Sequence, residues 1–336
     1  MIAESKGVMI CAELVVNGGL AAISMELLGV GRNLADNLGE ELSVLLMGSE
    51  IGPSLSLEAI ACGADRVYVA DNPLLSLYNS DVYTEVAAKV CRQVKPSIML
   101  LGQTDMGRDI APRLAARIGG GLAMDCIDLS IDHETGLMLQ TRPVFGGNAR
   151  AVMVTPTARP QMATIRPKTM PPIGRDETRQ GDVVSVEASM EESVIKTEII
   201  EIVQEEVTGV KLEEADIIVT GGRGIGSAEG FEIIRELSQV LGGAVGATRA
   251  ACDEGMAPAP IQVGQTGKIV SPNLYIAIAL SGAVQHLAGC SGSKHIVAIN
   301  TDPEAYIFKV AEFGIIGNYK EVLPPLIEKC RELLAQ

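Results

Sequence analysis

The chain has no tryptophan, only 3% aromatic residues and only three histidines among its 336 residues. A bound ring system would therefore be held mainly by polar side chains and backbone groups rather than by an aromatic cage. The histidines, His133, His286 and His295, are dispersed, and their spacing does not match a metal-ligand motif. No order of serine, histidine and aspartate stands out either, so we expect neither a metal site nor a catalytic residue.

The seven cysteines include no pair at CxxC spacing, so neither a zinc site nor an iron–sulfur cluster is indicated. An odd, scattered set is typical of reduced thiols, and we expect a cytoplasmic protein. The first residues lack a cationic region followed by an apolar run, so we expect no signal peptide. A run of about 18 apolar residues, as a membrane span requires, is also missing.

Positive charge is scarce: 27 Lys and Arg residues stand against 42 Asp and Glu, for a net charge of −15. This balance argues against a nucleic-acid partner, and any bound phosphate must be held by local donors. What is present is a hydrophobic fraction of 47%, enough for a large core, and 36 glycines that permit tight turns. The length indicates two domains.

Short apolar runs alternate with helical periods in the first half. The strand-like runs cover residues 7–15, 42–47, 66–70 and 98–101, and residues 20–38 have helical spacing. This βαβ alternation predicts a parallel sheet. Shorter segments over residues 126–165, with a turn at 133–136, predict a partly antiparallel extension.

Residues 168–181 have the composition of a loop, and a second βα series begins at Ala215. Helix 227–241 should begin at Ser227 and end at Gly242. The other predicted elements are strands 183–186, 197–203, 216–220, 274–280 and 295–300, and a last helix 321–334. We predict an α/β protein with two Rossmann-like or flavodoxin-like parallel-sheet domains, residues 1–206 and 207–336.

The turn Gly221-Gly222-Arg223-Gly224 lies between a predicted strand and a predicted helix. Such a turn offers free backbone N–H groups and a helix dipole to an anion, and Arg223 adds a cation. The full dinucleotide fingerprint is not met, because Ser227 takes the place of its last glycine. A plain helix-packing turn is the alternative.

Two further segments are polar. Residues 262–267 carry two amides, a hydroxyl and two glycines, which suit the edge of a flat heteroaromatic ring. They do not form a P-loop, because Gln262 replaces its first glycine and Ile269 follows Lys268. The turn before His286 is a second site for an anion or a ring edge, although His286 is also typical of a satisfied helix histidine.

These motifs, in this order, strongly resemble the alpha subunit of electron-transfer flavoproteins. The matching segments are Gly221-Gly222-Arg223-Gly224 and residues 243–251, 262–268, 274–277, 281–289 and 298–300. Looser matches in the first half are Gly107-Arg108-Asp109, Pro112-Arg113, Thr141-Arg142-Pro143 and Gly146-Gly147-Asn148.

The resemblance implies a heterodimer in which the first domain packs on a beta subunit and the C-terminal domain binds FAD. The cofactor-binding residues that it implies are Arg223, Thr248, Arg249, Val263, Gly264, Gln265, Thr266, Ser281, Gly282, Ala283, Val284, Gln285, His286, Asn300, Asn318 and Tyr319. Two positions depart from the family pattern: Thr248 stands where serine is common, and Asn318 stands where aspartate is common.

The resemblance also implies roles for three residues. Arg249 would lie over the flavin, His286 at its C2 carbonyl and Thr266 at N5, all as electrostatic tuners of a redox cofactor. The chain would be an electron carrier between flavin dehydrogenases, such as acyl-CoA dehydrogenases, and an acceptor oxidoreductase.

An electron-bifurcating, NADH-using form of the same flavoprotein is an alternative, as is a non-catalytic interaction subunit. A nicotinamide-dependent dehydrogenase is disfavoured. Residues 243–246 occupy the region about 20 positions after the glycine turn where an acidic residue would hold the ribose.

Overall fold

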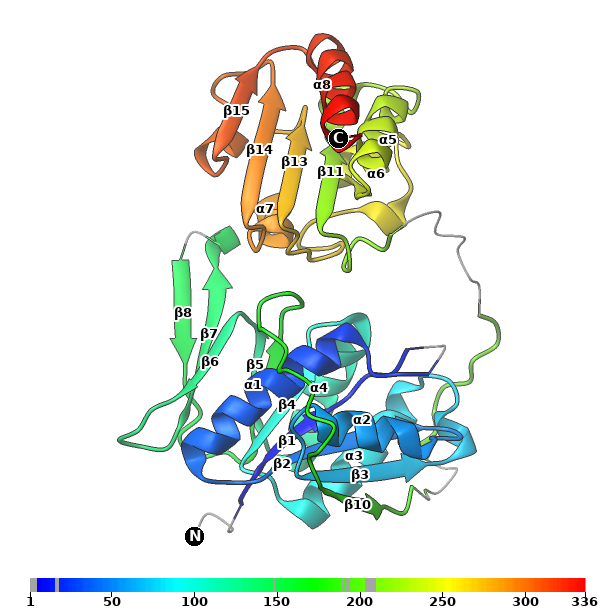
Figure 1. Ribbon diagram of the computed structural model, residues 1–336, viewed down its shortest axis with the longest axis vertical. Coiled ribbons are helices and arrows are strands. Elements are labelled where there is room, and N and C mark those ends of the chain that lie inside the picture. The colour runs from blue at the N-terminus through cyan, green and yellow to red at the C-terminus, as the bar shows by residue number, and fades with distance from the viewer. Residues whose placement is uncertain are drawn as a thin grey trace. The chain divides into compact units, whose positions relative to one another are not determined.

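The computed structural model describes residues 5–15, 18–147, 149–188, 190, 194–202 and 210–335 (Figure 1). The chain divides into two compact units. Unit 1 consists of Met1–Pro143 and Arg150–Val203, and unit 2 consists of Val144–Ala149 and Gln204–Gln336. The predicted domain boundary between residues 206 and 207 lies outside the described residues.

Unit 1 is built on a seven-stranded sheet with the order β10-β3-β2-β1-β4-β9-β5, in which every pair of neighbours is parallel. Its strands are β1 (Val8–Cys11), β2 (Leu42–Gly48), β3 (Arg66–Asp71), β4 (Ile98–Gly102), β5 (Gly121–Cys126), β9 (Gln161–Ile165) and β10 (Asp182–Ser185). The predicted parallel sheet is confirmed.

Helices cover both faces of this sheet. They are α1 (Ala22–Leu38), α2 (Pro53–Ala61), α3 (Ser80–Val94) and α4 (Asp105–Ile118). Alternate residues of β1 point to opposite sides: Val8 and Ile10 pack in the core beneath α1, and Met9 packs in the core beneath α3 and α4. Burial on both faces explains why these strands read as continuous apolar runs.

A second, three-stranded sheet joins β6 (Asp128–Ile131), β7 (Met138–Val144) and β8 (Ala149–Met153). It belongs to unit 1 except for Val144 and Ala149, which are part of unit 2. Strands β6 and β7 are antiparallel, which confirms part of the predicted extension. The remainder of that region is different, because β9 returns to the large sheet as a parallel strand. Residues 197–202 contain no strand, contrary to prediction, and residue 203 lies outside the described residues.

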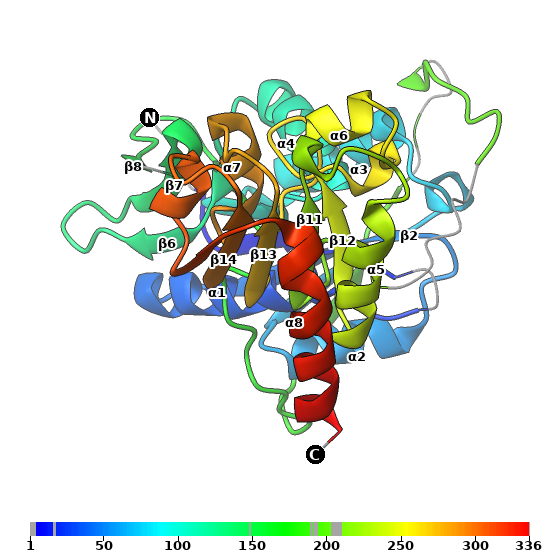
Figure 2. The same ribbon diagram turned by 90° about the horizontal axis from the view of Figure 1, so that it is seen from above.

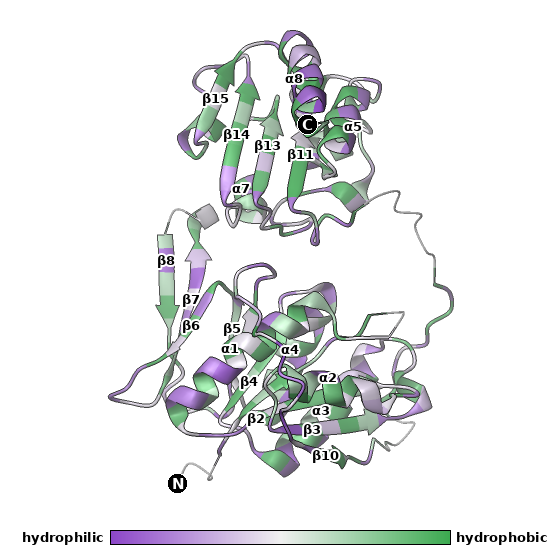
Figure 3. Cartoon of the chain, viewed as in Figure 1, coloured by the Kyte–Doolittle hydropathy of each residue, from purple (hydrophilic) through white to green (hydrophobic). Residues whose placement is uncertain are grey.

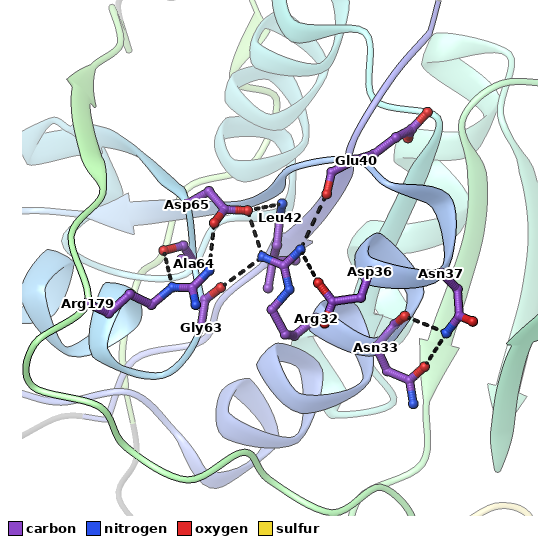
Figure 4. A network of polar contacts seen from close by, with 10 residues as sticks. All are labelled: Arg32, Asn33, Asp36, Asn37, Glu40, Leu42, Gly63, Ala64, Asp65 and Arg179. Atoms are coloured by element: carbon purple, nitrogen blue, oxygen red, sulfur yellow. Dashed lines mark hydrogen bonds and ion pairs between the residues drawn. The ribbon is translucent and has the colours of Figure 1, made fainter.

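The predicted loop 168–181 contains no helix or strand, and polar contacts hold it on unit 1. Its first residues donate three N–H groups to the buried carboxylate of Glu26. Figure 4 shows Arg179 near the end of the loop converging with Arg32 on Asp65, each nitrogen 2.6 Å from a carboxylate oxygen. Burial alone would raise the pKa of Asp65, but the Leu42 N–H and the two guanidinium groups outweigh it and lower that pKa.

Unit 2 has one five-stranded sheet with the order β12-β11-β13-β14-β15, again parallel throughout. The strands are β11 (Ile217–Gly221), β12 (Ala244–Ala247), β13 (Leu274–Ile278), β14 (His295–Asn300) and β15 (Phe313–Ile316). By position in the chain this order is second, first, third, fourth, fifth, as in flavodoxin-like folds. The predicted fold class is confirmed.

Helices α5 (Phe231–Val240) and α8 (Tyr319–Leu334) lie side by side on one face of this sheet, and the short α7 (Val284–Cys290) lies on the other (Figure 2). The five-residue α6 (Arg249–Asp253) follows β12. The strands are mainly hydrophobic, whereas α8 alternates hydrophobic and hydrophilic residues (Figure 3). This pattern suits a helix that covers a sheet with one face and meets water with the other.

Helix α5 starts later than predicted. Its N-cap is Gly230 rather than Ser227, so the predicted cap is wrong. The Ser227 hydroxyl accepts the Gly230 N–H at 3.1 Å and closes the turn that precedes the helix. Phe231, Ile234 and Leu237 are buried in the core of unit 2. Among the described residues, none of the helices is long and apolar enough to cross a membrane.

Candidate functional site

Most of the predicted cofactor residues follow the carboxyl ends of the unit 2 strands. Thr248 and Arg249 follow β12, Arg223 follows β11, and Asn318 comes shortly after β15. Carboxyl ends of parallel strands meet at one edge of a sheet, and ligands of doubly wound folds bind there, at the point where the strand order reverses. Here that point lies between β11 and β13. The strands are parallel and short, with four residues in β12, so motifs that are far apart in the sequence come together at the carboxyl edge of the sheet.

The glycine turn after β11 packs against the chain that leaves β13. A Cβ atom at position 222 would lie 2.3 Å from the carbonyl oxygen of Ala279. The Gly224 N–H donates to that same oxygen at 3.1 Å. The glycines are therefore needed for close packing at the switch point, as the packing alternative predicted. Arg223 stays exposed beside this turn and is available to an anion.

A cavity of about 360 Å³ opens at this edge. Its lining residues lie at the end of β14 or after β11, β13, β14 and β15: Gly224, Ile225, Gly226, Ala279, Ile299, Asn300, Thr301, Gly317, Asn318, Tyr319 and Lys320. The sequence motifs predicted Asn300, Asn318 and Tyr319 but missed Lys320 and Thr301. The one feature of the sequence that could have identified Lys320 and Thr301 is their position, since each comes within a few residues of a strand end.

The predicted polar residues at the cavity also hold the fold together. The Asn300 amide donates to the Leu280 carbonyl at 2.8 Å, and its oxygen accepts the Asp302 N–H at 3.1 Å. The Tyr319 hydroxyl donates to the Ile225 carbonyl at 2.8 Å.

Two departures from the family pattern have a structural reason. Asn318 caps α8 by accepting the Lys320 N–H at 3.0 Å, and asparagine and aspartate are equally good caps. Thr248 caps α6 in the same way by accepting the Ala251 N–H at 3.4 Å, as a serine hydroxyl would. Both replacements preserve the capping bond.

The polar loop at residues 262–268 is anchored at β12 by the Val263 N–H, which donates to the Ala247 carbonyl at 2.9 Å. Within the loop, the Gln262 amide donates to the Thr266 hydroxyl at 3.0 Å. Gly264 is buried, whereas Gln265 and Thr266 are exposed. The loop therefore offers an amide and a hydroxyl to a ligand at the edge.

Arg249 carries a positive charge at the same edge. Its guanidinium lies 3.3 Å from Asp253 one turn along α6, and its side chain is 67% exposed. A screened pair of this kind contributes little to stability, so the guanidinium is available to another anion.

His286 is buried, and both ring nitrogens are hydrogen bonded within the chain. Nδ1 lies 3.0 Å from the Val263 carbonyl oxygen, and Nε2 lies 2.9 Å from the Tyr275 hydroxyl. Burial lowers the pKa of His286 to about 4, so the ring is neutral near pH 7. It has the contacts of the satisfied helix histidine, and donation to a flavin carbonyl would require one of these two bonds to be exchanged.

In the rest of the predicted turn before α7, some residues are buried and others are exposed. Gly282 is buried, and the Ser281 carbonyl accepts the Ile307 N–H at 3.0 Å. The side chains of Ala283, Val284 and Gln285 are exposed.

This edge fits a dinucleotide with a flat ring. Lys320 lines the cavity and Arg223 precedes one of its glycines, so local cations can offset two phosphates on an acidic chain. Gln265 and Thr266 suit a polar ring edge. Among the described residues, no group of three or more His, Cys, Asp or Glu side chains is arranged to hold a metal ion.

The sequences of both units match those of known proteins. Residues 8–191 match the electron transfer flavoprotein domain, and residues 211–291 match the electron transfer flavoprotein FAD-binding domain. The electron transfer flavoprotein subunit alpha of Thermoanaerobacterium thermosaccharolyticum is 51% identical over 317 residues, 94% of this chain and 96% of the relative. That of Megasphaera elsdenii is 44% identical over 333 residues, 98% of each chain.

A third relative is Protein FixB of Clostridium saccharobutylicum, which is 45% identical over 334 residues, 99% of each chain. Near-complete coverage at this identity extends the resemblance to both units. The chain therefore belongs to the alpha-subunit family of electron transfer flavoproteins, and its second unit is the FAD-binding domain.

Proposed function

We propose that this chain is the FAD-carrying subunit of a conventional heterodimeric electron carrier, which passes electrons from flavin dehydrogenases to an acceptor oxidoreductase. The observation that carries the proposal is the gathering of Arg223, Arg249, Thr266 and Lys320 at the carboxyl edge of one parallel sheet. Acyl-CoA dehydrogenases are the donors that we propose. A cytoplasmic location is supported by the seven cysteines, all of them free thiols.

FAD, when bound, supplies the redox chemistry, because its ring system accepts and gives up electrons. The protein's part is binding and electrostatics. We assign Arg223 and Lys320 to the phosphates of FAD. The glycine turn has no side chains, so the phosphates can approach its backbone closely. Arg249 offers a positive charge to the ring, and the Thr266 hydroxyl offers a hydrogen bond to its polar edge. These groups tune a potential and need not transfer a proton.

Unit 1 packs on a beta subunit in this proposal. The test is co-expression with that subunit, followed by the absorption spectrum and the FAD content of the purified heterodimer. One FAD per heterodimer that is reduced by a flavin dehydrogenase supports the carrier. Two FAD with reduction by NADH would instead indicate the bifurcating form, and a colourless heterodimer that does not take up added FAD would refute both.

A further inference from the structure

The turn at residues 211–215, which we name the entry turn, comes just after the chain passes from unit 1 into unit 2. Within it, the Ala215 N–H donates to the Leu212 carbonyl at 3.4 Å. Leu212 and Ala215 are buried in the same hydrophobic cluster as Val263 of the polar loop and Val270 just after that loop. The entry turn and the polar loop are therefore parts of one packed core, although they are far apart in the sequence.

Lys268 closes the polar loop with both of its backbone groups. Its N–H donates to the Gln262 carbonyl at 2.7 Å, and its carbonyl accepts the Gly264 N–H at 3.1 Å. A Cβ atom at position 267 would lie 2.3 Å from the Gln262 carbonyl oxygen, so a glycine is needed for this tight closure. The exposed Thr266 lies inside the closed loop, so a displacement of Lys268 is passed on to it.

An ion pair joins the polar loop to the entry turn. The Lys268 ammonium lies 2.7 Å from a carboxylate oxygen of Glu213, and the two side chains are 31% and 34% exposed. The pair of Arg249 with Asp253 is longer, at 3.3 Å, and its side chains are 67% and 63% exposed. Partial burial reduces screening by water, so the Lys268 pair holds its two segments together more firmly than a surface pair within one helix does.

We propose that Lys268 and Glu213 are positioning residues for the FAD site, and that their ion pair couples the entry turn to the loop that receives the flavin. This inference rests on the proposed function. With the pair formed, the loop is held closed and the Thr266 hydroxyl is kept where it meets the ring edge. Coupling between two sites is reciprocal, so bound FAD stabilises the entry turn by the same free energy.

The experiment compares Glu213→Gln with Glu236→Gln in the full chain, purified with its beta subunit. Both substitutions remove one carboxylate charge from unit 2. Glu236 is the matched control, because it pairs with Arg331 at 2.8 Å between α5 and α8, and neither residue lines the cavity. A third variant reverses the pair by combining Glu213→Lys with Lys268→Glu. The dissociation constant for FAD and the flavin potential are measured for each.

The dissociation constant for FAD should rise about threefold in Glu213→Gln, the effect of one partly exposed ion pair, and should stay unchanged in Glu236→Gln. The flavin potential should shift in Glu213→Gln alone. The reversed pair should restore both quantities, because the attraction does not depend on which partner carries the positive charge. An affinity in Glu213→Gln equal to that in Glu236→Gln, or a reversed pair no better than Glu213→Gln, would overturn the proposal.

Hydrogen exchange tests the same coupling in the wild-type protein. The Glu214 N–H donates to the Lys211 carbonyl at 3.1 Å, so its exchange rate reports the opening of the entry turn. By reciprocity, FAD should slow this exchange about threefold more in wild type than in Glu213→Gln. An exchange rate that FAD leaves unchanged in wild type would overturn the coupling.

Exchange without FAD separates the ion pair from the cofactor. The Glu214 amide should exchange faster in Glu213→Gln than in wild type when both are free of FAD, and equal rates would overturn the role of the pair. A wild-type heterodimer that takes up no FAD would refute the proposed function, and the positioning role with it, while this difference in exchange would still establish that the ion pair holds the entry turn.

Discussion

Each unit has polar residues at the carboxyl edge of its own parallel sheet, but the hydrogen bonds of these residues differ between the units. In unit 1 the polar groups at or just after the strand ends bond to one another: Thr104 donates to Glu13 at 2.6 Å, and Thr164 near the end of β9 donates to Gln103. In unit 2 Arg249 and Thr266 remain exposed at the edge. Two parallel sheets thus have one closed carboxyl edge and one open carboxyl edge, and the open edge is where a ligand can add bonds.

The pKa of Glu13 shows how closed the first edge is. Burial raises that pKa above its ordinary value, and the Thr104 hydrogen bond counteracts the rise only in part. A carboxyl group that is buried at this edge and bonded to its neighbour serves the fold and is not open to a ligand. We therefore expect polar residues of unit 1 to affect stability and those of the unit 2 edge to affect FAD binding.

The largest effect should follow from Arg166→Ala in unit 1. The guanidinium is 2% exposed and makes two hydrogen bonds to Asp125, of 2.8 and 2.7 Å. Removing it leaves a carboxylate without its counter-charge, which costs about 3–5 kcal/mol. Urea unfolding measures the loss, and FAD affinity under native conditions should not change.

Arg113→Ala is the matched control, because Arg113 pairs with Asp109 on the surface and should contribute no more than about 1 kcal/mol. Equal losses in the two variants would break the distinction between a buried and a solvated pair.

Arg249→Ala should produce the opposite result at the open edge. The exposed guanidinium contributes little to folding, so the free energy of unfolding should change by less than about 1 kcal/mol. FAD affinity should fall about tenfold or more, since a charge-assisted contact contributes roughly 1.5–3 kcal/mol. Fluorescence titration with FAD provides the measurement.

Arg235→Ala serves as the control, because this arginine makes a similar exposed pair with Glu232 on α5. An affinity loss in Arg235→Ala as large as that in Arg249→Ala would mean that general charge, rather than position at the edge, attracts the cofactor.

Acid should weaken unit 1 through Asp65. Its pKa is lower in the folded state than in the unfolded chain, so its contribution is complete above the unfolded value of about 3.9 and is lost as the pH falls through the folded value. Asp65→Asn should reduce the slope of stability against pH below about pH 4. Asp36→Asn, which changes an exposed partner of the same Arg32, is the control. Identical slopes for wild type and Asp65→Asn would contradict the assignment.

Much of the fold could be predicted from local pattern. The run that became β14 was predicted with the correct ends, because its four inner residues form an apolar run between two polar residues, as is typical of a strand inside a parallel sheet. Strands β12 and β15 were missed: the first is four residues with an internal glycine, and the second is fully exposed, so neither carries a periodic signal.

The site was predicted in outline, since residues after strand ends are recognisable along the chain. The partners of each side chain were not. His286 lies 11 residues from Tyr275 and 23 from Val263, and only the crossing of α7 over the sheet brings the three together. Contacts of this kind depend on tertiary packing, which spacing in a single sequence does not encode.

The smallest effect should come from Thr266→Ala, which tests the open edge at the level of a single hydroxyl. Thr266 is exposed, and among the described residues its hydroxyl accepts the Gln262 amide, which leaves its own proton available to a ring edge. FAD should stay bound while the flavin potential shifts by about 20 mV, because one neutral hydrogen bond of about 1 kcal/mol corresponds to that shift in a two-electron couple. Thr266→Ser keeps the hydroxyl and should restore the wild-type potential. A shift that serine does not reverse would point to loop packing, and an unchanged potential in the alanine variant would remove Thr266 from the flavin altogether.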